Sequence, residues 1–183
     1  MASAMSANLW QPEGAYDSLA TITVPSGGVS SITFTGIPST YKHLQLRTLA
    51  RTNRSGANQD PLKFIFNSDT ASNYSNHFLY GDGSSASAFA DTPISFVAAY
   101  MASAATASSN VFGTCVIDLL DYSNTNKFKT LRSLGGIDNN GNGAISLTSG
   151  FWRSTSAITS IAISPQVGTS FDQYSSFALY GCK

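Results

Sequence analysis

The chain has 183 residues, and its formal net charge at pH 7 is zero because ten acidic residues balance ten basic ones. Only 11% of the residues are charged, against roughly 25% in typical soluble proteins. A chain with so weak a field does not attract nucleic acid or an anionic membrane, so we expect neither as a partner. The length fits one domain with a single core.

Residues 1–17 are small and polar except for Leu9, Trp10 and Tyr16. This composition predicts an extended N-terminal arm, followed by a single domain over residues 18–183. Trp10 either plugs one end of that domain or anchors the arm on a neighbouring subunit. The arm lacks the basic and apolar regions of a signal peptide, and no apolar run approaches the roughly 18 residues of a membrane-spanning helix. We therefore expect synthesis in a cytoplasm and no membrane insertion.

Alternation of apolar and polar residues predicts strands along the first half of the domain. The cluster Pro25–Gly28 favours a turn that joins the first two strands into a hairpin. Residues 43–51 fit a strand because Leu44 and Leu46 share one face, although Leu, Gln and Arg also form helices well. The predicted strands are Leu19–Val24, Val29–Thr35, His43–Arg51, Leu62–Phe66 and His77–Tyr80.

The middle of the chain, Ser84–Asn110, is dominated by Ala and Ser. Its apolar island Ile94–Met101 favours a strand, with a short Ala-rich helix as the alternative. Val111–Leu120 is apolar on both faces, which is typical of a central strand covered on both sides. The region is thus expected to contribute one strand from the island and one central strand.

The run Asp138–Gly143 (DNNGNG) is the strongest turn signal in the chain, because Asn and Gly tolerate the positive φ of tight hairpins. It should join Lys127–Ile137 to Ala144–Trp152 as an antiparallel pair. The apolar residues of the second strand share one face of it. They are Ile145, Leu147 and Phe151.

The last quarter of the chain, Ile158–Gly181, has the pattern of two strands separated by the turn-forming residues Pro165–Thr169. In the closing strand Phe177 and Leu179 face one way, so this strand must pair with strands that precede it. The chain then holds about nine to eleven short strands separated by turns, the pattern of a sandwich or barrel. The sequence predicts an all-β protein, an antiparallel β-sandwich that is jelly-roll-like.

Groups that could carry catalysis are few and scattered. His43 and His77 lie in predicted strands without a nucleophile motif around any serine, and neither has a second metal ligand three or four positions away. Cys115 and Cys182 are far apart in the sequence, which indicates two reduced thiols unless their strands lie together and the thiols pair. We expect a protein that is not an enzyme and holds no cofactor or metal.

Two further sets of side chains have a possible binding role. Asp69 with Asn67 and Asn73 could offer oxygen ligands to calcium, but ordinary polar turns use the same residues. Trp152 and Tyr174 belong to a set of aromatic residues that often stand beside Ser, Asn or Gly, and they are candidates for stacking on a glycan. Each aromatic side chain could equally cap the end of the core.

Four stretches resemble a group of small virion proteins of tailed bacteriophages, cyanophages included. The resemblance runs from Leu9 onward and is carried by structural motifs. It implies a jelly-roll-like sandwich in a virion surface component, and it carries over no catalytic residues. The four stretches are FTGIPSTYKHLQLR (Phe34–Arg47), FIFNSDTASNYSNHFLYGDGS (Phe64–Ser84), SGFWRSTSAITSIAISP (Ser149–Pro165) and FDQYSSFALYG (Phe171–Gly181).

Members of this group are described as capsid decoration, tail or fibre proteins, so the resemblance implies a structural role on the outer surface of the virion after synthesis in the host cytoplasm. The first expectation is a decoration (cement) protein that binds and stabilises the shell of major capsid protein. It would be a homo-oligomer, with a trimer favoured, and Leu9, Trp10 and Tyr16 would form its contact arm. The alternative is a tail or tail-fibre component that binds host-surface glycan through Trp152 and Tyr174.

Overall fold

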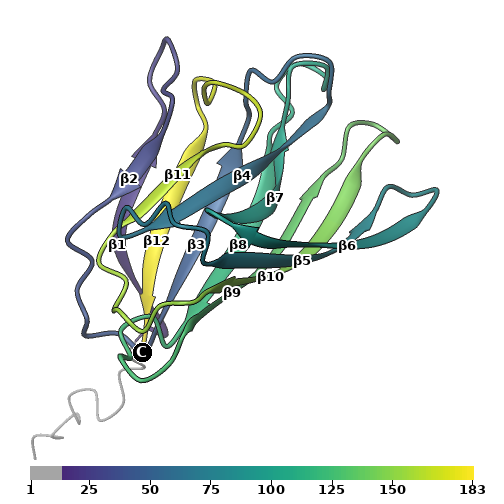
Figure 1. The fold of residues 1–183 in the computed structure, drawn as a ribbon. Coiled ribbons are helices and arrows are strands. Elements are labelled where there is room, and N and C mark those ends of the chain that lie inside the picture. The colour runs from purple at the N-terminus through teal and green to yellow at the C-terminus, as the bar shows by residue number, and fades with distance from the viewer. Residues whose placement is uncertain (1–13) are drawn as a thin grey trace, which may run out of the picture.

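Residues 14–183, the part of the chain that the computed structural model describes, form twelve strands and no helix. Figure 1 shows the strands in two layers, and all ladders between them are antiparallel. The large sheet holds, in spatial order, β1 (Tyr16–Thr23), β12 (Ser176–Cys182), β3 (His43–Ala50), β8 (Gly113–Leu120), β9 (Lys129–Ile137), β10 (Ala144–Trp152), β5 (Tyr74–Gly81) and β6 (Ala86–Ile94). The small sheet holds β2 (Ile32–Phe34), β11 (Ile161–Pro165), β4 (Gln59–Phe66) and β7 (Val97–Ser103).

The core lies between the two sheets, which confirms the predicted all-β sandwich. Leu44, Leu46 and Ile117 from the large sheet pack there with Phe64 and Phe66 from the small one. Each comes from a strand in which alternate residues point inward, so the two-residue period supplies the core directly. The jelly-roll assignment stays a prediction.

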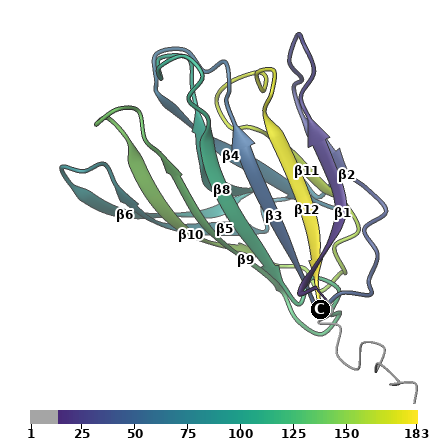
Figure 2. The same cartoon turned by 180° about the vertical axis from the view of Figure 1, so that it is seen from behind.

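The closing strand pairs with strands that precede it in the chain, as the sequence predicted. β12 lies between β1 and β3 and pairs with both, with Leu179 opposite Ala20 on one side and Leu46 on the other. Phe177 and Leu179 point into the core. The end of the chain therefore completes the large sheet, beside the start of β1 (Figure 2).

The predicted hairpin of the first two strands is wrong. β1 pairs with β12 in the large sheet, whereas β2 pairs with β11 in the small sheet, where Phe34 lies opposite Ile161. The turn at Pro25–Gly28 carries the chain from one layer to the other. Local turn chemistry could not reveal this, because the partners of both strands arrive more than 100 residues later.

Two other expectations need correction in the middle of the chain. β8 is covered on one side only, since its inward residues are buried whereas Val116 on the opposite face is exposed. The apolar island at residues 94–101 is divided between the end of β6 and most of β7, which belong to different sheets. The strand alternative for the island is confirmed, but the structure has two strands in this region where the sequence predicted one.

β7 lies unusually close to the large sheet because glycines face it. An added Cβ at Gly135 would lie 1.9 Å from the Tyr100 carbonyl oxygen, and one at Gly150 would lie 2.4 Å from a methyl of Val97. The inward residues beside these glycines are also small, namely Ser133, Ser146 and Thr148. The sandwich is thin at this end, and larger side chains have no room on the inner face there.

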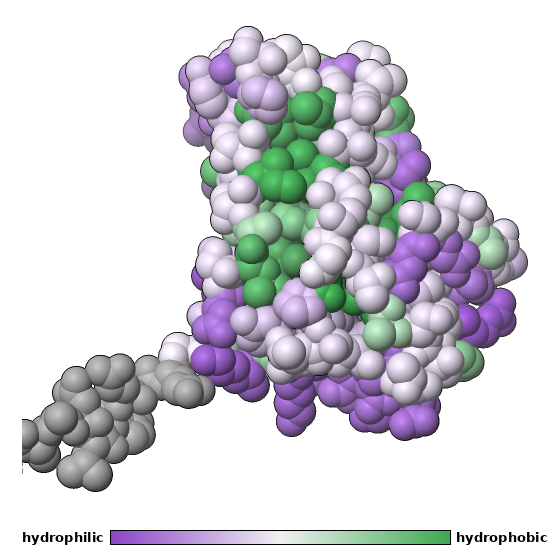
Figure 3. Space-filling model, turned by 90° about the vertical axis from the view of Figure 1, so that its left-hand side faces the viewer, coloured by the Kyte–Doolittle hydropathy of each residue, from purple (hydrophilic) through white to green (hydrophobic). Residues whose placement is uncertain are grey.

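The two sheets do not close along the side formed by β1 and β2. Figure 3, which looks at this side, shows an apolar stripe along the molecule between paler rims. A hollow of about 250 Å³ opens here, lined in part by Leu19, Phe34 and Leu179. The core therefore reaches the surface at this edge.

Candidate interaction surface

The outer face, defined as the face of the large sheet that turns away from the small sheet, carries a continuous apolar row. Leu134 of β9 lies directly opposite Val116 of β8 and Leu147 of β10, and Leu147 lies opposite Leu79 of β5. These four side chains, which we call the apolar row, are 42–52% exposed. Large apolar residues in cross-strand register on a solvent-facing surface are typical of an interface.

Strand β10 shows why these residues are outside. The prediction that Ile145, Leu147 and Phe151 share one face is confirmed, but that face is the outer one. The inward positions hold Ser146 and Thr148, whose hydroxyl groups are buried without a hydrogen-bond partner in the described part of the chain. Because β7 lies close to the inner face of β10, only small residues fit there. The usual pattern of apolar residues inside and polar residues outside is therefore reversed in this strand.

A polar row and a glycine row flank the apolar row on the outer face. The polar row places Ser149 between His77 and Arg132, with Asp118 opposite Arg132. The Gln45 amide donates a hydrogen bond of 2.9 Å to the Asp118 carboxylate. The glycine row places Ile145, 58% exposed, between Gly136 and Gly81. The face thus alternates ridges with gaps where side chains are absent.

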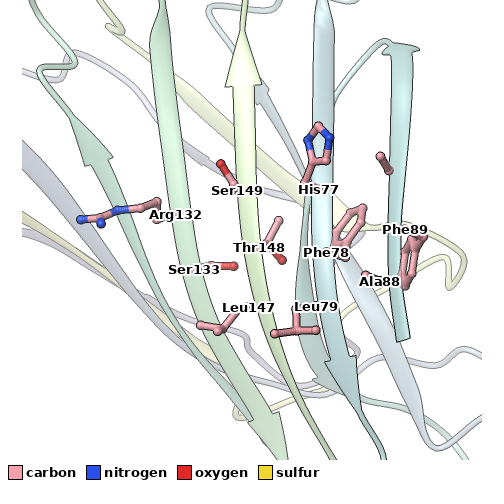
Figure 4. A pocket seen from close by; sticks show the side chains of 11 residues that line it. His77, Phe78, Leu79, Ala88, Phe89, Arg132, Ser133, Leu147, Thr148 and Ser149 are labelled. Carbon is pink, nitrogen blue, oxygen red and sulfur yellow. The ribbon is translucent and has the colours of Figure 1, made fainter. Parts of the chain in front are cut away.

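Two hollows of about 630 Å³ each are set into this face. Figure 4 shows the first, with Leu79 and Leu147 side by side and with His77 and Arg132 on either side of Ser149. The second hollow is lined by Val116, Leu134, Gly136 and Ile145 among others. Both hollows are shallow and adjoin the apolar row, so they shape the surface rather than enclose a ligand.

The apolar row ends at Arg47 of β3, which lies opposite Val116. Its guanidinium lies over the rings of Tyr16 and Tyr180, 5.1 Å and 4.7 Å from their centroids. Such contacts hold a cation against the sheet. The structure therefore places Tyr16 in edge strand β1 and corrects the boundary of the predicted arm at this point. Leu9 and Trp10 lie outside the described residues.

Trp152 is not available for stacking on a glycan, so its predicted role is wrong. The side chain is only 2% exposed, and its ring stacks on Tyr74 at 6.1 Å and packs against Phe66 at 5.7 Å. Its indole N–H donates a 2.7 Å hydrogen bond to the Asp69 carboxylate. The other possibility that the sequence left open, an aromatic cap on the core, describes this residue correctly.

Tyr174, the second predicted stacking residue, lies at the surface. It is 68% exposed and has a positive φ of 72° in the loop that precedes β12. Its backbone N–H donates to the Val24 carbonyl at 3.0 Å, which fixes the loop without using the ring. Tyr174 lies away from Trp152, so the two predicted stacking residues do not form one site.

The predicted calcium oxygens are used within the loops. Asp69 accepts hydrogen bonds from the Asn73 amide, the Trp152 indole and the Ala71 backbone, and the bond from Asn73 is the main reason that its pKa lies below the usual value. Asn67 accepts from the backbone N–H groups of residues 159 and 160. In residues 14–183 no group of three or more His, Cys, Asp or Glu side chains could hold a metal ion.

The histidines and cysteines are not brought together either. Three strands separate His43 on β3 from His77 on β5, and His43 Nδ1 accepts a hydrogen bond from the Asp121 backbone at 3.0 Å. Cys115 and Cys182 are free thiols. Burial raises the pKa of Cys115 to about 12, so this thiol is protonated at neutral pH and is a poor nucleophile.

Two buried charges that sequence reasoning missed support loops. The Asp60 carboxylate, fully buried, accepts hydrogen bonds from Thr52 and from the backbone N–H groups of residues 167 and 168. The Lys129 ammonium donates to three backbone carbonyls, and burial lowers its pKa. Satisfied in this way, these groups are structural. In the sequence, the signal for such a group is a charged residue at a strand position whose side chain points inward.

Comparisons with protein-family models, curated proteins and solved structures found no significant match. No helix in the described part is long and apolar enough to cross a membrane. The exposed apolar row in cross-strand register is the functional feature that the geometry of residues 14–183 supports best.

Proposed function

We propose that this chain is a non-enzymatic structural protein of a phage virion, most directly a capsid decoration protein that binds and stabilises the shell of major capsid protein. The observation that carries the proposal is the apolar row on the outer face. Its residues gain nothing for the monomer by facing water, and a protein partner would bury them. The likeness of four sequence stretches to phage virion proteins supplies the setting in which such a partner exists.

The energetics suit adhesion by surface burial. Covering four half-exposed aliphatic side chains contributes on the order of 3–6 kcal/mol, since full burial of each is worth about 1.5–3 kcal/mol. The chain has few charges and no net charge, so many copies can crowd on one particle without long-range repulsion. These properties support a structural component that acts by adhesion to its neighbours.

The test is the number of copies of this protein in purified virions, measured by quantitative mass spectrometry against the major capsid protein. A decoration protein should be present in numbers on the order of hundreds, because its sites repeat with the symmetry of the shell. Particles that lack it should lose their DNA at a lower temperature than complete particles. Absence of the protein from purified virions would reject the proposal.

The alternative is a tail or fibre component that binds host-surface glycan, and the exposure of Tyr174 favours it. Tyr174→Ala should then weaken binding to host polysaccharide about two- to tenfold, because stacking contacts of an aromatic ring are worth about 0.5–1.5 kcal/mol. Titration calorimetry with the purified polysaccharide measures this. Tyr16→Ala, at an exposed tyrosine on another element, is the matched control. A tail role also requires only a handful of copies per virion.

A further inference from the structure

The outer face has the form of a surface that fits a second copy of itself. We propose that two copies of the chain pack through their outer faces, about a two-fold axis that runs along the strands between β9 and β10. The inference rests on the proposed role of this face as a protein contact and adds what covers it in the free protein: a second copy, which the major capsid protein replaces when the chain binds the shell. Two sheets stacked face to face with nearly aligned strands are a common packing arrangement.

The apolar row is self-complementary under this symmetry. The axis places β10 of one copy over β9 of the other, and β5 over β8. Because the row runs straight across these strands, Leu147 then faces the second copy's Leu134, and Leu79 faces the second copy's Val116. Each contact occurs twice, as an isologous interface requires.

The glycine row supplies a ridge and a gap that match. Ile145 stands out from the sheet beside Gly136, its direct neighbour on β9. The same axis places Ile145 over the second copy's Gly136, where the absent side chain leaves part of a hollow of about 630 Å³. The ridge and the matching gap lie on the same pair of strands of one chain. This arrangement fits a second copy of the chain, because each copy then supplies both halves of the contact.

The charges are also compatible with a second copy. In the polar row the axis places His77 over the second copy's Asp118, and Arg132 over the second copy's Ser149. The side chains of His77 and Arg132 have no hydrogen-bond or ion-pair partner within the described residues, so both are free to make these contacts. Since the row carries both signs, two copies of it attract rather than repel each other.

The area is sufficient for a weak, specific dimer. The patch covers roughly 600 Å² per copy. It spans the six strands from β6 to β3, which lie about 4.8 Å apart, and the polar, apolar and glycine rows, which lie about 6.7 Å apart. The total of about 1,200 Å² is the lower limit of the range for stable interfaces, so the full patch must be buried and the dissociation constant should lie in the micromolar range.

Sedimentation equilibrium of the purified full chain between about 1 and 100 µM, a range that brackets a micromolar constant, tests the inference. We expect a monomer–dimer equilibrium. Leu147→Lys and Leu134→Lys should each weaken it more than 100-fold, because the symmetry buries two unpaired ammonium groups. Val167→Lys, at an exposed apolar residue in the loop after β11, is the matched control and should leave it unchanged. A wild-type protein that stays monomeric, or that forms the trimer favoured by the sequence, overturns the two-fold pairing.

A charge test reports the register. His77→Asp places a carboxylate over the second copy's Asp118, so it should weaken the dimer about tenfold or more in sedimentation equilibrium. Adding Asp118→Asn removes the facing charge and should restore most of the lost affinity, whereas Asp118→Asn alone should change the dissociation constant little. Within one chain the two positions lie on strands about 14 Å apart, so the recovery reports a contact between copies. A double variant that dimerises no better than His77→Asp overturns the register. None of these outcomes depends on virions, so a dimer in solution that is absent from particles would reject only the proposed function.

Discussion

Replacement of Trp152 with alanine is expected to lower the free energy of unfolding by about 3–5 kcal/mol, the range for truncating a buried aromatic residue. The ring fills the space between Tyr74 and Phe66 and is almost fully buried. Removing it also leaves the Asp69 carboxylate without one of its donors. Urea denaturation of the purified variant measures the loss.

Two comparisons make this expectation specific. Tyr174→Ala, at an exposed ring, should change the unfolding free energy by less than about 0.5 kcal/mol.

Trp152→Phe keeps most of the packing but loses the indole N–H. The hydrogen bonds lower the pKa of Asp69 in the folded state, so their contribution to stability is full above the unfolded pKa of about 4 and is lost as the pH falls through the lower folded-state pKa. The unfolding free energy of Trp152→Phe should therefore be lower than that of the wild type at pH 7, and the difference should be smaller at pH 3. Equal stability of the alanine variants of Trp152 and Tyr174 would contradict the buried position of the indole.

Gly135→Ala is expected to be the most damaging single-methyl change in the described residues. The new Cβ would lie 1.9 Å from the Tyr100 carbonyl oxygen and 2.7 Å from the Met101 nitrogen. Both atoms belong to the backbone of β7, which is held in the small sheet by β4 and cannot move aside cheaply. The loss should reach at least about 3 kcal/mol, the upper end for overpacking a core.

The neighbouring glycine provides the control for this effect. Gly136 is adjacent in β9 but faces outward, and its added Cβ would lie 3.4 Å from the nearest atom, the Ala144 oxygen. Gly136→Ala should change the unfolding free energy by less than about 1 kcal/mol. Thermal unfolding of the two variants side by side decides the matter. Similar melting temperatures would mean that β7 does not approach the large sheet as closely as described.

The candidate site was only half visible in the sequence. The alternation in Ala144–Trp152 correctly grouped Ile145 with Leu147, but a period of two residues says which side chains share a face and not which face is covered. Here the covering strand is β7, which accepts glycine and small polar residues, so the larger aliphatic residues became the outer face. The same limit explains why the sequence left both a glycan-stacking role and a core role open for Trp152, which is a core residue.

The sequence by itself determined most strands and turns, the all-β class, and the position of Phe177 and Leu179 in the core. These features depend on contacts between near neighbours or on the strand period. Only the tertiary structure decided that β1 and β2 belong to different sheets, that Val116 and Leu134 meet in one exposed row, and that Trp152 is enclosed. Such pairings join strands far apart in the chain, and they are selected by how whole faces fit together rather than by any signal in a single segment.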